Sequence, residues 1–347
     1  MRHIRLPGLA VIACLAAAGA AAQDAAPGLH EDVTFSNYPP LARNSQLLSR
    51  VFTPLTLAGI RREFARDGKS LSETSVDLAA EKFLVYVPPT RPPQGYRLMV
   101  FVPPWQKAQL PQGWRPVLDQ FGMIFVTPAR SGNEEDIVSR REPLALIAAQ
   151  NVMVQYPVDP AQVFVGGMSG GARLALRLAL AYPDLFHGAL LNSGSDVIGT
   201  IYEPLPPAPL FRQFQTGTRL LYVTGDHDAA NVESEMRSKR AMQDWCVSDV
   251  ASIRMPFAGH DVAPPAILSR ALQALLQPER PDPERMAVCR AAIEAEVADG
   301  LVKADALIAG GNRADAQKTV KNIDAKFGGL AAPRSVELDT ILTRIQP

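Results

Sequence analysis

The chain has 347 residues, with 35 basic and 35 acidic side chains, so its formal net charge is zero. Hydrophobic residues make up 47% of it, which is ordinary for a globular protein with one large domain or a large and a small one. Because there is no net positive charge and no long basic run, nothing in the composition indicates binding to nucleic acid or to anionic lipid.

Residues 1–22 have the features of a secretory signal peptide. Two arginines precede an apolar run, and three alanines at 20–22 form a small-residue cleavage site. A transmembrane anchor fits less well, because the run is short, rich in alanine and followed directly by polar residues. Lipid attachment at Cys14 is a second alternative, although the residues after it stay apolar. We therefore expect an exported protein, periplasmic or secreted, whose mature chain begins near Gln23.

The segment after the leader is expected to precede the main domain. Residues 23–75 form an extension that is helical in part and carries no evident chemistry. Residues 76–89 then resemble an added antiparallel strand or hairpin at the edge of a sheet. The main domain is expected to begin at residue 76 and to end at about 280.

Within residues 76–280, short β-rich runs alternate with segments of helical length. The expected strands are 96–102, 122–127, 163–166, 188–192, 219–224 and 252–257, and the expected helices are 142–155, 172–182, 230–245 and 265–277. The strands are almost continuously apolar, which is typical of strands buried on both faces. The sequence therefore predicts an α/β fold with a doubly wound, mostly parallel sheet.

Two further segments interrupt or follow this alternation. Residues 202–215 are too rich in proline for a regular helix, and an insertion between two core strands is typical of a lid or a substrate wall. Residues 283–347 are rich in Ala, Asp and Lys and contain no strand-like run, so we expect three or four helices that form a small C-terminal appendage. No catalytic constellation is evident in that appendage.

One motif carries the chemistry. Gly167-Met168-Ser169-Gly170-Gly171 matches G-x-S-x-G, and it lies between an expected strand and an expected helix, as a nucleophile elbow requires. The turn is so sharp that side chains beside the serine would collide, and glycines provide the room. The stretch around Ser169 contains neither G-x-G-x-x-G nor G-K-[ST], so a dinucleotide or phosphate loop is disfavoured there.

A serine nucleophile needs a base, and the base needs an acid that fixes its tautomer. In a hydrolase of this kind the order is serine, acid, histidine, each at the carboxyl end of a strand. Asp228 and His260 follow the expected strands 219–224 and 252–257, and the sequence favours them over Asp226 and His227. His227 sits one strand too early for the base.

From about residue 76 to 277 the chain resembles the α/β-hydrolase superfamily, and within it the secreted polyhydroxybutyrate depolymerase and feruloyl esterase-like branch. The residues that carry the likeness are "YPVDPAQVFVGGMSGGARLALRLALAYPDLFHGALLNSG". The resemblance implies hydrolysis of a small-molecule or oligomeric ester, with the triad roles on Ser169, Asp228 and His260. A serine peptidase of the prolyl-oligopeptidase kind and a binding protein on a hydrolase scaffold are the alternatives.

The oxyanion hole departs from that family. Relatives usually have His-Gly after the strand that supplies the second donor, whereas this chain has Pro103 and Pro104, which carry no N–H. We expect the backbone N–H of Gly170 to be paired with that of Trp105, or else of Gln106.

The remaining cysteines and histidines do not indicate a cofactor. Their positions give no metal-ligand spacing, and no organic cofactor is implied. Cys246 and Cys289 are the two cysteines outside the leader. In an oxidising compartment such a pair is compatible with a disulfide, and two separately buried thiols are the alternative.

Overall fold

The computed structural model describes residues 26–279 and 282–344, so the leader and Cys14 lie outside the described residues. Its centre is one sheet of eight strands in the order β1-β2-β4-β3-β5-β6-β7-β8. The strands are β1 Gly28–Val33, β2 Phe83–Val87, β3 Tyr96–Val102, β4 Met123–Pro128, β5 Val158–Met168, β6 Gly188–Asn192, β7 Arg219–Gly225 and β8 Val250–Met255. Only the pairings of β1 with β2 and of β2 with β4 are antiparallel. The predicted α/β fold with a mostly parallel sheet is confirmed.

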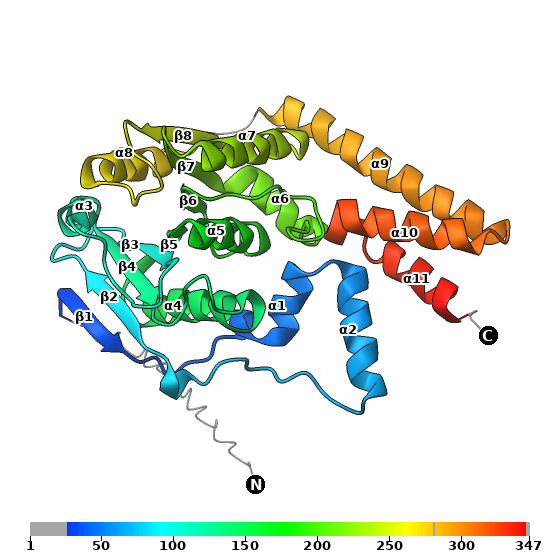
Figure 1. Ribbon diagram of the computed structural model, residues 1–347, viewed down its shortest axis with the longest axis horizontal. Helices are drawn as coiled ribbons and strands as arrows, with labels where there is room; N and C mark the ends of the chain where they lie inside the picture. The colour runs from blue at the N-terminus through cyan, green and yellow to red at the C-terminus, as the bar shows by residue number, and fades with distance from the viewer. Residues whose placement is uncertain (1–25, 280–281, 345–347) are drawn as a thin grey trace, which may run out of the picture.

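Helices cover both faces of the sheet (Figure 1). The helices of the main part are α3 Trp114–Phe121, α4 Glu142–Gln155, α5 Gly170–Ala181, α6 Ala208–Gly217, α7 Ala229–Asp244 and α8 Pro265–Leu275. One core cluster joins the sheet to α4 and α5, and a second joins the opposite face to α3 and α8. The central strands are buried on both faces, which explains why their sequences are continuously apolar rather than alternating.

Three elements differ from the prediction. The edge strand β1 lies in the segment expected to be helical in part, where no strand was predicted, and α3 was not predicted. The expectation that residues 202–215 avoid regular helix is wrong for their second half, because α6 begins at Ala208. The prolines at 204, 206 and 207 precede the helix, and Pro209 stands in its first turn, where the missing N–H has no intrahelical partner to lose.

The N-terminal and C-terminal helices pack against each other at one end of the molecule (Figure 1). They are α1 Asn44–Val51 and α2 Pro54–Arg66 on one side, and α9 Pro283–Ala309, α10 Arg313–Phe327 and α11 Arg334–Arg344 on the other. The N–H of Leu55 donates to Asp324 Oδ1 at 3.0 Å, and Arg62 Nη1 lies 3.0 Å from Asp339 Oδ2. The helical character expected of the C-terminal segment is present over 283–344, whereas the domain limits at 75 and 280 stay predictions.

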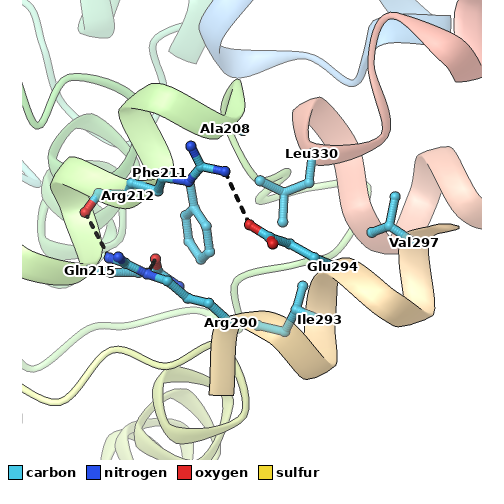
Figure 2. A pocket seen from close by; sticks show the side chains of 9 residues that line it. All are labelled: Ala208, Phe211, Arg212, Gln215, Arg290, Ile293, Glu294, Val297 and Leu330. Carbon is cyan, nitrogen blue, oxygen red and sulfur yellow. Dashed lines mark hydrogen bonds and ion pairs between the residues drawn. The ribbon is translucent and has the colours of Figure 1, made fainter. Parts of the chain in front are cut away.

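Helix α9 is also fixed to the main part through α6 and a disulfide. Figure 2 shows Arg290 and Glu294 of α9 facing Arg212 and Gln215 of α6 across a small pocket. Arg290 Nε donates to Gln215 Oε1 at 2.7 Å, and Arg212 Nη2 donates to Glu294 Oε1 at 3.0 Å. Cys246 and Cys289 form a disulfide, with their Cα atoms 6.0 Å apart, so the predicted disulfide is confirmed. Within the described ranges, we find no helix with the length and apolar character needed to span a membrane.

Candidate active site

Ser169 stands at the turn between β5 and α5 in a strained backbone conformation. Its φ is 56° and its ψ is −124°, a region that non-glycine residues rarely adopt and that is often found at functional sites. The N–H of Ser169 donates to the carbonyl of Asn192 at 2.8 Å. A Cβ on Gly171 would overlap the carbonyl oxygen of Val102, so the turn is packed directly against the loop that follows β3. The glycine-rich sequence is therefore needed for this close approach.

Asp228 and His260 are brought together from the ends of two neighbouring strands. Asp228 follows β7 and is largely buried, and His260 follows β8 with 44% of its side chain exposed. His260 Nδ1 lies 2.7 Å from Asp228 Oδ2. The two loops are also joined by their backbones, because Asp226 N–H donates to Met255 O at 3.2 Å and His227 N–H donates to Ala258 O at 3.0 Å.

This contact determines which nitrogen of His260 is free. An ionised carboxylate only accepts hydrogen bonds, so Nδ1 carries the proton in the bond to Asp228. Nε2 of the neutral ring is then the acceptor, as a base for Ser169 requires. No hydrogen bond joins Ser169 to His260 among the residues that the structure describes.

Asn231, in the first turn of α7, completes the environment of the acid. Its Nδ2 lies 3.0 Å from Asp228 Oδ1, 2.8 Å from Asp228 Oδ2 and 3.1 Å from His260 Nδ1. Burial alone would raise the pKa of Asp228, but the hydrogen bonds from His260 and Asn231 outweigh it and lower the pKa below its usual value. The carboxylate therefore stays ionised. The contact of Asn231 with Asp228 was not predicted from the sequence. The available signal was its position three residues after Asp228, on the same face of the first helical turn.

The rejected alternatives lie together on the outside of the acid loop. Asp226 Oδ1 is 3.8 Å from His227 Nε2, and the side chains are 39% and 66% exposed. Across the described part of the chain, neither residue contacts His260 through its side chain. Asp228 rather than Asp226 is thus the acid that meets His260.

Asn192, at the end of β6, connects the serine turn to the histidine loop. Besides the carbonyl contact to Ser169, its side-chain Nδ2 donates to Asp261 O at 3.0 Å, and its Oδ1 accepts from Ala263 N–H at 2.8 Å. The residue is 1% exposed. The sequence predicted the end of the strand at residue 192. It did not predict which loop the side chain of Asn192 would contact, because that depends on packing.

The loop expected to supply the oxyanion hole is fixed by the segment at 130–133. Asn133 N–H donates to Pro104 O at 3.1 Å, and Arg130 N–H donates to Gln106 O at 2.6 Å. Within the described ranges, the N–H groups of Trp105 and Gly170 have no hydrogen-bond acceptor. Both are available to an oxyanion, although this does not decide between Trp105 and Gln106 as the second donor.

A cavity of about 470 Å³ opens beside Gly170, the residue that follows the serine. Its walls come from Phe52, the segment at 133–141, α5 and the segment at 196–203, whose last two residues belong to the expected lid or substrate wall. The volume is in the range of small-molecule sites. The cavity is therefore the candidate space for a substrate group next to the serine.

Comparison with known proteins gives limited sequence similarity. No family model matches the chain. Over 95 residues, which are 23% of this chain, it is 28% identical to a poly(3-hydroxybutyrate) depolymerase of Ralstonia pickettii. The match covers 20% of that protein's own length.

Solved structures extend the comparison over more than half of the chain. It is similar to a ferulic acid esterase (16% identity, 56% of this chain and 90% of that one, TM-score 0.42). It is also similar to S-formylglutathione hydrolase of Staphylococcus aureus (12% identity, 57% and 93%, TM-score 0.45). A third similar structure is an esterase of Thermogutta terrifontis (18% identity, 58% and 87%, TM-score 0.41). Among these comparisons, the 95-residue match to a poly(3-hydroxybutyrate) depolymerase agrees with the resemblance expected from the sequence.

Proposed function

We propose that this chain is a serine esterase that hydrolyses carboxylic esters through an acyl-enzyme on Ser169. The observation that carries the proposal is the hydrogen-bonded pair of Asp228 and His260 at the same sheet edge as the strained serine turn. The similarity to proteins named as esterases supports the same reaction class. We assign the reaction to the domain at 76–280.

In the first half of the reaction, His260 Nε2 accepts the hydroxyl proton while Ser169 Oγ attacks the ester carbonyl carbon. Asp228 keeps the ring in the required tautomer and stabilises the imidazolium that forms. The negative charge on the carbonyl oxygen is met by the N–H groups of Gly170 and Trp105. His260 then gives its proton to the leaving alcohol.

In the second half, water replaces the alcohol. His260 takes a proton from the water as the water attacks the acyl carbon. The second tetrahedral intermediate then collapses and releases the carboxylic acid product, while His260 returns the proton to Ser169 Oγ. The same two N–H groups stabilise the charge in both halves.

A hydrolysis panel tests this function against its alternatives. Wild type and Ser169→Ala are compared on short and long acyl esters, feruloyl esters, hydroxybutyrate oligomers and peptides. The proposal expects ester cleavage that disappears in the variant. Cleavage of peptides alone would favour a peptidase, and tight binding of esters without turnover would favour a binding protein.

We further propose that the protein is exported. The leader at 1–22 and the disulfide between Cys246 and Cys289 support this, because disulfides persist in oxidising compartments. Expression of the full chain followed by fractionation and N-terminal sequencing tests it. A mature terminus near Gln23 outside the cytoplasm is expected, whereas a chain that keeps residues 1–22 in the cytoplasm would contradict export. A terminus at Cys14 carrying lipid would favour the anchored alternative.

A further inference from the structure

The cavity beside Gly170 has a strongly charged lining. Apolar groups such as Ile137 and Val138 form part of it. Its polar lining residues are Asn133, Arg141, Arg173, Arg177, Asp196 and Glu203. Three arginines thus line a cavity beside the proposed catalytic serine.

Arg141 is buried without a counter-ion. It is 3% exposed, and its guanidinium donates to Ser131 O at 3.0 Å, to Pro103 O at 3.1 Å and to Asn133 Oδ1 at 3.4 Å. All three acceptors are neutral, and no ion pair to Arg141 occurs in the described part of the chain. Burying a cation is costly unless it is paired, so an unpaired buried arginine at a cavity indicates a missing anion.

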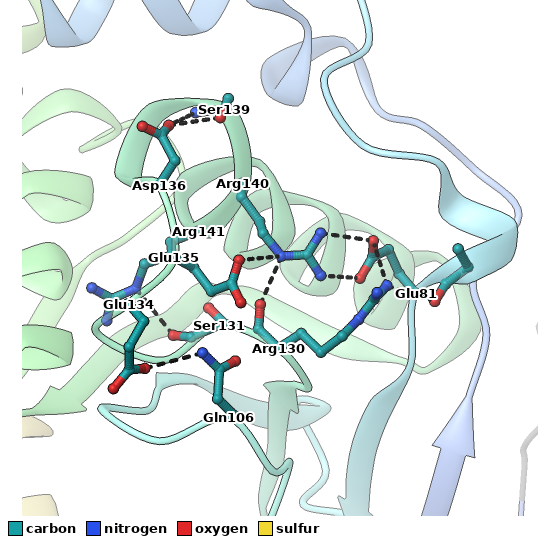
Figure 3. A network of polar contacts seen from close by, with 11 residues as sticks. Glu81, Gln106, Arg130, Ser131, Glu134, Glu135, Asp136, Ser139, Arg140 and Arg141 are labelled. Atoms are coloured by element: carbon teal, nitrogen blue, oxygen red, sulfur yellow. Dashed lines mark hydrogen bonds and ion pairs between the residues drawn. The ribbon is translucent and has the colours of Figure 1, made fainter.

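The carboxylates near Arg141 are each engaged elsewhere. Burial lowers the pKa of Arg141, and three carboxylates oppose that effect. Each of the three has another partner: Glu135 has Arg140 (3.3 Å), Glu142 has Arg177 (2.5 Å), and Glu134 has the neutral amide of Gln106 (3.0 Å). Figure 3 shows Arg140 turned toward Glu81, while Arg141 reaches the other way, to Ser131.

The other two arginines of the cavity have acidic partners. Arg173 lies 3.3 Å from Asp196, and Arg177 lies 3.6 Å from Glu203 in addition to its contact with Glu142. Burial raises the pKa of Glu203 to about 8, so this carboxyl is mostly neutral at pH 7. Of the three arginines that line the cavity, Arg141 is thus the one without an acidic partner among the described residues.

From this we infer that the cavity binds a carboxylate of the substrate, with Arg141 as its counter-ion, so that the preferred substrates are esters that carry a free carboxylate. The inference rests on the proposed esterase function, since it assigns the cavity to the substrate of Ser169. Nε and Nη2 of Arg141 donate to the three neutral acceptors, so Nη1 is the guanidinium group open to a carboxylate among the described residues, and Ile137 and Val138 provide an apolar wall for the linking chain.

Two pairs of matched esters test whether a substrate carboxylate is preferred, and on which side of the scissile bond it must lie. Phenyl hydrogen glutarate and phenyl pentanoate share a five-carbon acyl chain and differ by a terminal carboxylate. The pair 4-(butyryloxy)benzoate and phenyl butyrate places the carboxylate on the alcohol side instead. Wild type should have a kcat/KM at least about tenfold higher for the charged member of one pair, because hydrogen bonds between charged groups are among the strong ones. No preference for the charged member in either pair would overturn the inference.

Variants connect that preference to Arg141. Arg141→Gln should remove it, so that kcat/KM falls about tenfold more for the charged ester than for the neutral ester of the same pair, whereas Arg141→Lys should retain part of the preference. Arg140→Gln is the matched control, since its guanidinium meets Glu81 and Glu135 outside the cavity. An equal fall for charged and neutral esters in Arg141→Gln would show a structural role only and would contradict the inference.

Binding without turnover separates this inference from the proposed function. Glutarate titrated calorimetrically into Ser169→Ala should bind, and the double variant with Arg141→Lys should bind it more weakly. If no ester is hydrolysed by wild type but glutarate binds in this way, the esterase proposal fails while the carboxylate site stands. If esters are hydrolysed but glutarate does not bind and the charged esters are not preferred, the carboxylate site fails alone.

Discussion

Asn192 accepts a hydrogen bond from the N–H of Ser169 at 2.8 Å through its main-chain carbonyl. Its side chain meanwhile holds the backbone of the loop that carries His260, through Asp261 O and Ala263 N–H. One buried residue thus sets the position of the proposed nucleophile relative to the proposed base. Asn192 is a positioning residue, because its side chain acts through the loop and not on the substrate.

Replacing Asn192 with alanine keeps the carbonyl contact and removes the side-chain contacts. We expect kcat to fall about 10- to 100-fold with KM nearly unchanged, since displacing a catalytic group by about 1 Å is enough for such a loss. Steady-state kinetics together with thermal unfolding measure this. Asn151→Ala is the control, because Asn151 is also buried and donates to Asn37 O and Ile147 O, away from the histidine loop. Equal kinetics in the two variants would contradict a positioning role.

The acid is tested by isosteric amides at two positions. Asp228→Asn should lower kcat by about 10⁴, because the amide no longer selects the tautomer with a proton on His260 Nδ1. Asp226→Asn should change kcat little, since Asp226 pairs only with the exposed His227 in the described ranges. Rates on one neutral ester, with folding checked by circular dichroism, give the comparison. A larger loss in Asp226→Asn than in Asp228→Asn would show that Asp226, and not Asp228, is the acid of the triad.

The second oxyanion donor is tested at Trp105. Trp105→Pro removes the N–H, and we expect kcat to fall about 10²- to 10³-fold with little change in KM. Trp105→Ala keeps the N–H and should mainly alter acyl preference. Equal loss in both variants would show that the side chain matters instead of the backbone. Full activity in Trp105→Pro would move the donor to Gln106 or elsewhere.

The disulfide is expected to contribute to stability more than to catalysis. It closes a loop across a sequence separation of 43 residues, and the chain-entropy model gives about 4 kcal/mol for a loop of this length. Denaturant unfolding of Cys246→Ser with Cys289→Ser should show that loss, with esterase activity retained below the unfolding transition. Unchanged stability would contradict the expectation, and loss of activity in the folded variant would connect α9 to the active site.

Much of the fold could be predicted because its signals are local. Strands buried on both faces are continuously apolar, and the motif around Ser169 fixes one strand, one turn and one helix. The edge strand β1 was missed because it is only half-buried and its sequence, GLHEDV, has no apolar alternation. Helix α3 is short and contains Pro116, which obscured its pattern.

The surroundings of the site depended on contacts between distant segments. Asp228 and His260 could be predicted because strand order places both at one sheet edge. Asn192 and Arg141 carry no motif, and their roles follow from which loop or carbonyl each side chain meets. Arg141 in particular resembles any arginine at the start of a helix until its lack of a counter-ion is seen in the structure.

The most direct test of the account is covalent labelling of the serine. A fluorophosphonate probe reacts with serines activated by a base, so the folded mature protein should be labelled at Ser169. Mass spectrometry of the digested adduct identifies the site, with Ser169→Ala and His260→Ala as controls that should not be labelled. Labelling of wild type at Ser169 alone is the result that the account predicts. A label on another serine, or no label on the folded protein, would contradict it.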